Sequence, residues 1–232
     1  MQRRSIRLSL VVAVAGLYAI WRRGYLIPFT PEIIPRLMAD DPSDHPPREG
    51  SLGGNHDPDY VLDQLIASDV INATDDNLRV TDDFEDAWQA EIHRLADASL
   101  RELVERTATI VPSNYSVSSV RSDHGNRYVV IADATGRVTG ETWVRRPKVI
   151  AELAAISVLE GQGISAAVAR SAASALCVFL ATCPGCGGSV TERRAGGCCS
   201  PPRQTKDGQI VMALVCRDCG VHLHIFNPSF NA

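Results

Sequence analysis

The chain has 232 residues, of which 45% are hydrophobic and 6% aromatic, and its formal net charge is −4 at pH 7. This size and composition allow one or two small domains with a core of modest size. Seven cysteines without regular framework spacing argue against a disulfide scaffold.

Residues 1–27 are predicted to form an N-terminal membrane anchor. The stretch from Leu8 to Trp21 carries no charge and would be about 21 Å long as a helix, shorter than a hydrocarbon core of about 30 Å. Arg7 and Arg22 flank it and can extend their side chains to the interface. Two alternatives are a buried helix and a cleaved export signal, because Arg3-Arg4 resembles a twin-arginine start.

Residues 28–56 are predicted to form a linker. Their prolines forbid a long helix, and their glycines loosen the chain further. These residues are Pro28, Pro31, Pro35, Pro42, Pro46, Pro47, Gly50, Gly53 and Gly54. We therefore expect the linker to separate the anchor from the rest of the chain.

Residues 57–182 are predicted to be an α+β body that begins with two helices. Asp57 and Pro58 have the residue types of an N-cap and a first helical turn, and a short helix should follow. Thr81 should cap one long helix, whose apolar positions keep helical spacing from Phe84 to Val104. From Leu37 to Thr109 the sequence has 18 acids and 5 arginines, which indicates a solvated acidic face.

The second half of this body should contain a small antiparallel meander and two more helices. Alternating apolar residues predict strands at Val117–Arg121, Tyr128–Ala132 and Thr142–Val144. A helix should begin at Pro147 and end at Gly161, and an apolar helix should follow over Ile164–Ala181.

Residues 183–232 carry the strongest chemical signal, which is two C-x-x-C-G turns. The ligand residues are Cys183, Cys186, Cys216 and Cys219, with 29 residues between the two pairs. Two such turns can close a shell of four sulfurs around one tetrahedral metal, so the spacing predicts one structural Zn²⁺. The glycine after each pair allows the chain to turn without a Cβ clash.

These paired turns resemble a zinc ribbon over Cys183 to Phe226. The resemblance implies two knuckles at the tips of β-hairpins, with strands at Gln209–Val215 and Val221–Phe226. A redox-active dithiol is the alternative, but thioredoxin-like motifs open a helix after a strand, and Gly187-Gly188 would open a helix poorly.

Several further residues near the knuckles have more than one interpretation. Cys198 and Cys199 are either ordinary packed thiols or a ligand-exchanging or redox-sensitive pair. His222 and His224 share one face of a strand, where they are either surface histidines or ligands of a second metal. Cys177 falls in an apolar helical run and should be a small buried residue.

The whole layout resembles, more loosely, uncharacterised archaeal membrane-anchored proteins with a C-terminal ribbon. The shared features are the N-terminal apolar segment, the Leu-Arg-Val-Thr-Asp-Asp-Phe helix start with its later Trp, and the Cys-Cys pair in the ribbon. This resemblance implies no known activity. The sequence as a whole predicts an α+β protein with an N-terminal membrane-type helix, a helical and antiparallel β body, and a zinc ribbon.

Three classes of function fit these observations. The first is a non-enzymatic, membrane-tethered module that binds a protein partner the sequence does not name. The second is nucleic-acid binding through the ribbon, which we do not expect to dominate because the ribbon has a net charge of only +2 beside an acidic body. The third is a thiol- or metal-dependent enzyme. No oligomeric state is predicted.

Zinc thiolates are preserved in a reducing compartment, so we expect residues 28–232 to lie in the cytoplasm. A twin-arginine-like export signal would place them outside.

Overall fold

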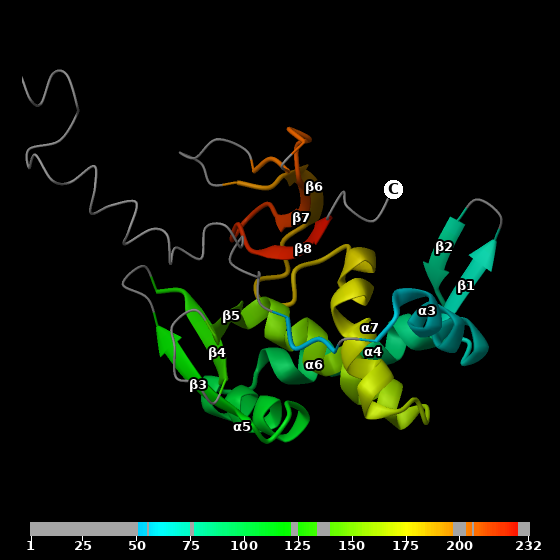
Figure 1. Ribbon diagram of the computed structural model, residues 1–232, viewed down its shortest axis with the longest axis horizontal. Coiled ribbons are helices and arrows are strands. Elements are labelled where there is room, and N and C mark those ends of the chain that lie inside the picture. Colours follow the sequence, from blue (N-terminus) through cyan, green and yellow to red (C-terminus); the bar gives the residue numbers. More distant parts are fainter. Residues whose placement is uncertain are drawn as a thin grey trace, which may run out of the picture. The chain divides into compact units, whose positions relative to one another are not determined.

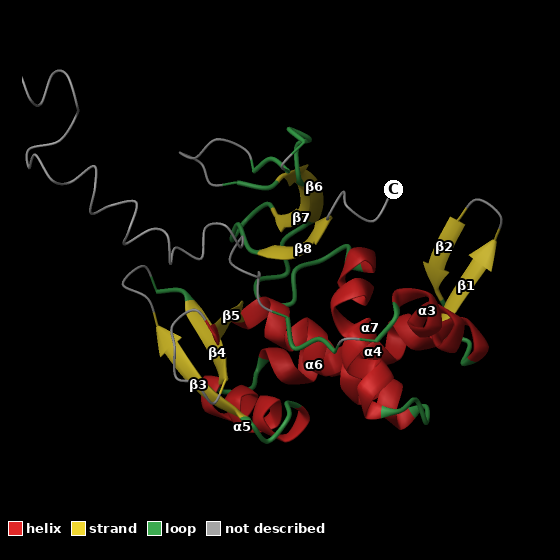
Figure 2. Ribbon diagram, viewed as in Figure 1, coloured by secondary structure: helices red, strands yellow, loops and turns green. Residues whose placement is uncertain are grey.

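The computed structural model describes residues 51–54, 56–74, 77–121, 125–133, 140–196, 203–205 and 207–226. All of them belong to one of the chain's two units, Arg48–Ala232. They form five α-helices, one short 3-10 helix and three small antiparallel sheets, so the predicted α+β class is confirmed (Figure 2).

Three of the five α-helices begin with a capping side chain, whereas Thr81, at the N-cap position of α4 (Asp82–Ala96), makes no side-chain cap hydrogen bond. The bounds of the helices are α3 (Pro58–Ala67), α4 (Asp82–Ala96), α5 (Leu100–Ile110), α6 (Arg146–Gly161), α7 (Ala166–Leu176) and the 3-10 helix η3 (Cys177–Phe179). The carboxylate of Asp57 accepts hydrogen bonds from the first turn of α3, as predicted. Ser99 and Ser165 cap α5 and α7 in the same way.

The predicted single helix from Asp82 to Val104 is wrong, because α4 ends at Ala96 and α5 begins at Leu100. Apolar spacing continues across the break, so the pattern alone does not show it. Arg146, 50 residues away in sequence, donates from Nη2 to the carbonyl oxygen of Ala96 at 2.6 Å. Such a long-range partner satisfies a carbonyl that the helix end leaves free.

The strands form three separate sheets. Their bounds are β1 (Ile71–Thr74) and β2 (Asn77–Val80) in a hairpin, β3 (Tyr115–Arg121), β4 (Arg127–Asp133) and β5 (Glu141–Arg145) in a meander, and β6 (Val190–Arg194), β7 (Met212–Cys216) and β8 (His222–Phe226) in the C-terminal sheet. The meander and the last two strands were predicted. Strands β1 and β6 were not, because each is short and mostly polar or exposed.

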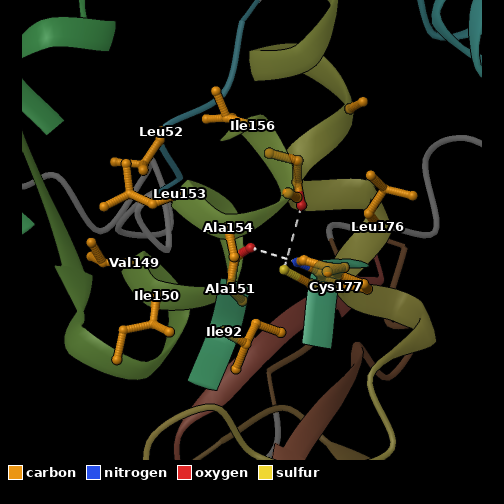
Figure 3. Packing of buried hydrophobic residues seen from close by; sticks show 14 of the residues in the cluster. Leu52, Ile92, Val149, Ile150, Ala151, Leu153, Ala154, Ile156, Leu176 and Cys177 are labelled. Atoms are coloured by element: carbon orange, nitrogen blue, oxygen red, sulfur yellow. Dashed lines mark hydrogen bonds between the residues drawn. The ribbon is translucent and has the colours of Figure 1, made fainter. Parts of the chain in front are cut away.

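Helix α6 is the centre of the described structure (Figure 1). Ten of its sixteen residues are buried, and α4 and α7 pack against it. It also contacts strands β4, β5 and β8. Figure 3 shows part of the main hydrophobic cluster around it, including Leu52, Leu153, Leu176 and Cys177. A helix buried on nearly all sides in this way organises the packing of the other elements.

The predicted membrane anchor at Leu8–Trp21, and residues 28–50 of the predicted linker, lie outside the described residues. Among the helices that the structure describes, none has the length and apolar character needed to cross a bilayer.

Candidate metal centre

The four predicted ligand cysteines come together at one point of the C-terminal sheet. Their sulfur atoms all lie within 4.8 Å of one another. The Sγ atoms of Cys183 and Cys219 are 3.7 Å apart, and those of Cys186 and Cys216 are 3.5 Å apart. Each close pair therefore joins one knuckle to the other, and we call this group of four the cysteine cage.

The two knuckles have the same backbone geometry. Cys183 N–H donates to the carbonyl oxygen of Gly188, and Gly187 N–H donates back to that of Cys183. In the second knuckle, Cys216 N–H donates to Val221, and Gly220 N–H donates to Cys216. Gly187 and Gly220 have φ values of 72° and 65°, a region that favours glycine. The predicted role of the glycine after each pair is confirmed.

Backbone N–H groups point toward the cage sulfurs. Burial opposes ionisation of the Cys216 thiol, but N–H groups of Cys219 and Asp218 hydrogen-bond its sulfur, and its pKa falls to about 7. Burial raises the pKa of Cys183, which accepts similar hydrogen bonds from Gly185 and Cys186. Such N–H groups stabilise thiolate charge, which is the form that binds a metal.

The cage fits a tetrahedral metal ion. With Zn–S bonds of about 2.3 Å, the sulfurs of a tetrahedral site lie about 3.8 Å apart. The two close sulfur pairs, at 3.7 and 3.5 Å, agree with that spacing. Four thiolates are also soft ligands of the kind that zinc prefers. These residues can therefore hold one metal ion.

Both knuckles rest on the start of α6. Arg145, the last residue of β5, donates from Nη1 to the carbonyl oxygen of Gly220 at 3.3 Å. A Cβ atom placed on Gly185 would lie 2.5 Å from Cγ of Pro147, so only glycine fits against this proline. Neither contact was predicted, because each joins residues far apart in the sequence.

The cage is continuous with the core of the body. Cys183 and Cys216 are buried and belong to the main hydrophobic cluster, together with Val221 and Leu223 of the ribbon. Cys186 and Cys219 are exposed. Each knuckle thus faces the core with its first cysteine and solvent with its second.

The remaining predicted candidates have different positions. His224 contacts the carbonyl oxygen of Ser174 through Nδ1 at 3.1 Å, so it helps to hold β8 against α7. In the part of the chain that the structure describes, no metal-ligating group other than the cage includes three or more side chains, so His222 and His224 do not form one there. Cys198 and Cys199 lie outside the described residues.

Cys177 is buried, as predicted. Its sulfur contacts the carbonyl oxygen of Ala173 at 3.4 Å, and burial raises the pKa of this thiol far above its ordinary range. A thiol in that environment is a poor nucleophile.

The structure contains a buried ion pair that the sequence did not lead us to predict. Lys148 and Glu152 lie one turn apart on α6 and are both buried, with Nζ 3.7 Å from Oε1. Glu152 Oε2 also accepts a hydrogen bond from the backbone N–H of Leu52 at 2.6 Å. A lone lysine and a lone acid four residues apart in an otherwise apolar run were the signal that could have revealed this pair.

Two regions of the chain match models of one known protein family. Residues 59–173 match the central-domain model of a family of unknown function, DUF8054, and residues 1–45 match the N-terminal-domain model of the same family. The cysteine cage lies outside both matched ranges. No curated protein and no solved structure matches the chain.

Proposed function

We propose that the cage holds one structural Zn²⁺ and that the chain is a non-enzymatic protein-interaction module, tethered to a membrane by residues 1–27. The observation that carries this proposal is the seating of both knuckles on the start of α6, through Arg145–Gly220 and Pro147–Gly185. A metal bound here would fix the ribbon to the body as well as closing the ribbon itself.

The role of zinc would be structural. Cys183, Cys186, Cys216 and Cys219 would fill all four tetrahedral positions, and a closed site leaves no open position for a substrate. Zn²⁺ supplies binding energy that is largely folding energy at such sites. This chain's own residues supply the thiolates, the N–H groups that stabilise them, and the contacts to α6.

The exposed side of the cage is the surface that we propose for partner binding. Cys186 and Cys219 are exposed, and so are Arg217, Asp218 and Gly220 of the second knuckle. Because the first cysteine of each knuckle is anchored in the core, this surface would be held rigidly when metal is bound. Rigid presentation lowers the entropy cost of binding.

A second candidate is nucleic-acid binding by the ribbon. Arg193 and Arg194 are consecutive exposed residues at the end of β6, and Arg217 is exposed on the second knuckle. Arginine contacts to phosphates are the usual basis of such binding. We rank this function second because the ribbon's net charge is only +2 and the acidic region 37–109 has a net charge of −13.

We further propose that the folded unit lies in the cytoplasm, where a reducing environment keeps the thiols available for zinc. The export alternative remains the competing proposal for the N-terminal segment.

Capture of partners by full-length chain in detergent-solubilised membranes tests the proposed function. Chemical cross-linking followed by mass spectrometry would compare the wild-type chain with the Cys216→Ser and Arg217→Glu variants. We expect a specific protein cross-linked near 216–220 in the wild type and lost in both variants. Equal capture by all three chains would refute binding at the cage, and RNA or DNA recovered in place of protein would favour the second candidate.

A further inference from the structure

The charges on the described surface are separated along helix α4. Its first turns carry four exposed acids, Asp82, Asp83, Glu85 and Asp86, which we call the acidic end. Acids at a helix N-terminus are favoured by the helix dipole, so they stabilise α4 itself. Within the described residues, none of the four is in an ion pair.

Arginines gather at the opposite end of the same helix. We call Arg121, Arg127, Arg145 and Arg146 the arginine corner. Arg146 donates from Nη2 to the carbonyl oxygen of Ala98 at 3.0 Å, as well as to Ala96, which places the corner at the C-terminus of α4. The other three lie at the adjacent end of the β3–β4–β5 sheet.

The corner has little compensating charge. Arg121 and Arg127 are directly opposite each other in the β3–β4 ladder and both are exposed. Like charges in that relation are destabilising. No ion pair between described residues involves any of the four arginines, although the charge of Asp97 acts on Arg146. Asp123, in the hairpin loop, lies outside the described residues.

The acidic end and the arginine corner are too far apart to neutralise each other within one molecule. Helix α4 has 15 residues, so its ends are about 22 Å apart. Charges separated by more than about 10 Å are largely screened from each other in ordinary buffers. A second molecule in the opposite orientation can supply the missing partner at both ends at once.

We propose that two copies of the chain pair in an antiparallel arrangement, with the acidic end of each copy on the arginine corner of the other. Twofold symmetry makes the two contacts identical and closes the assembly as a dimer. Because both contacts form in a single complex, the second benefits from the effective concentration set by the first. This inference does not depend on zinc binding or on the proposed function.

Other occupants of the corner would behave differently. A nucleic acid or an acidic peptide would use the arginine corner alone and leave the acidic end without a role. Pairing with a second copy uses both, so charge changes at either end must have the same effect. This symmetry makes the proposal testable by exchanging charges.

The test uses the full-length chain, light scattering at about 50 mM salt and, for every sample, the same mild detergent. One variant carries Arg121→Glu and Arg127→Glu, and another carries Asp82→Arg and Asp83→Arg. Each variant alone would place like charges together at both contacts and should be monomeric. An equal mixture restores opposite charges at both contacts and should form a heterodimer. A single chain with all four substitutions should again form a homodimer.

Controls separate charge effects from folding effects. Arg101→Glu changes an exposed arginine on α5, outside the corner, and should leave the dimer unchanged. Circular dichroism verifies that each variant is folded. Raising the salt from about 50 to 500 mM should weaken the wild-type dimer by about tenfold, because exposed ion pairs are screened.

Four results would overturn the proposal. These are a wild-type chain that stays monomeric at about 100 µM in low salt, a dimer that survives either pair of substitutions, an equal mixture that stays monomeric, or assemblies that grow beyond two copies. Binding of a (dT)20 oligonucleotide that is lost in the Arg121→Glu/Arg127→Glu variant, with no self-association, would assign the corner to phosphate instead.

Discussion

Lys148 and Glu152 form a buried ion pair on helix α6, with Nζ of the lysine 3.7 Å from Oε1 of the carboxylate. The other carboxylate oxygen accepts a hydrogen bond from the backbone N–H of Leu52. This hydrogen bond attaches the chain at Leu52 to helix α6. Removing one partner of such a pair leaves an uncompensated buried charge, whereas removing both charges can be nearly neutral.

We predict that Lys148→Met lowers the free energy of unfolding by about 3 kcal/mol, because the Glu152 carboxylate loses its counterion. The double variant Lys148→Met/Glu152→Gln should be more stable than Lys148→Met alone, since the glutamine can still accept from Leu52. Urea unfolding of the wild type, Lys148→Met, Glu152→Gln and the double variant forms a double-mutant cycle. Equal destabilisation by the single and double variants would contradict a charged pair.

The same two variants should differ in how their stability depends on pH. Burial raises the pKa of Glu152 above its ordinary value. The folded state therefore binds the proton more tightly than the unfolded state, so the stability that this group contributes is lost as pH rises through its folded pKa. The stability gap between Lys148→Met/Glu152→Gln and Lys148→Met should widen from about pH 5 to pH 8. A constant gap would indicate that Glu152 is solvated when Lys148 is replaced.

Gly185→Ala should weaken the contact between the first knuckle and α6. The added Cβ would lie 2.5 Å from Pro147 Cγ, and overpacking of this kind costs about 1–3 kcal/mol. Thermal unfolding measures the loss. Gly161→Ala is the matched control, because a Cβ there meets nothing within 4 Å. If both variants have the same melting temperature, the knuckle does not pack on Pro147 in solution.

Metal analysis tests the cage directly. We expect one zinc per chain in protein purified under reducing conditions, and none in Cys216→Ser. Because Cys183 and Cys216 belong to the main core, chelation should also reduce hydrogen-exchange protection in α6. Cys177→Ala should retain the zinc, since Cys177 lies outside the cage. A stoichiometry near zero in the wild type would refute the zinc proposal.

Deleting residues 1–27 should release a folded, zinc-loaded chain from the membrane fraction, because the deletion leaves Leu52, which packs in the main core, in place. Fractionation and metal content of the truncated chain measure both effects. Labelling of intact and lysed cells with an impermeant amine reagent tests the proposed cytoplasmic location. Strong labelling of the folded unit in intact cells would place it outside, and a full-length chain found wholly in the soluble fraction would remove the anchor.

Binding to DNA or RNA should be weak and sensitive to salt at physiological ionic strength, because a few arginines on a chain of net charge −4 release few counterions. Fluorescence anisotropy with labelled 20-mers of each type measures the affinity. Sub-micromolar binding to either would reverse our ranking of the two candidate functions.

The sequence by itself determined the features that depend on neighbouring residues. The C-x-x-C-G spacing identified the four cage cysteines, because a knuckle is built within six residues of backbone and its glycine is required by local geometry. Asp57 was identified as the cap of α3 for the same reason, since a cap bonds only to the turn that follows it.

Only the tertiary structure decided which surfaces meet. At the end of α4 a carbonyl group accepts a hydrogen bond from Arg146, and the knuckles contact Arg145 and Pro147, all from distant parts of the chain. The burial of Lys148 and Glu152 likewise depends on elements that pack around α6. Periodicity and spacing report contacts within a few residues, whereas these contacts join residues 38 to 100 positions apart and exist only after the chain has packed.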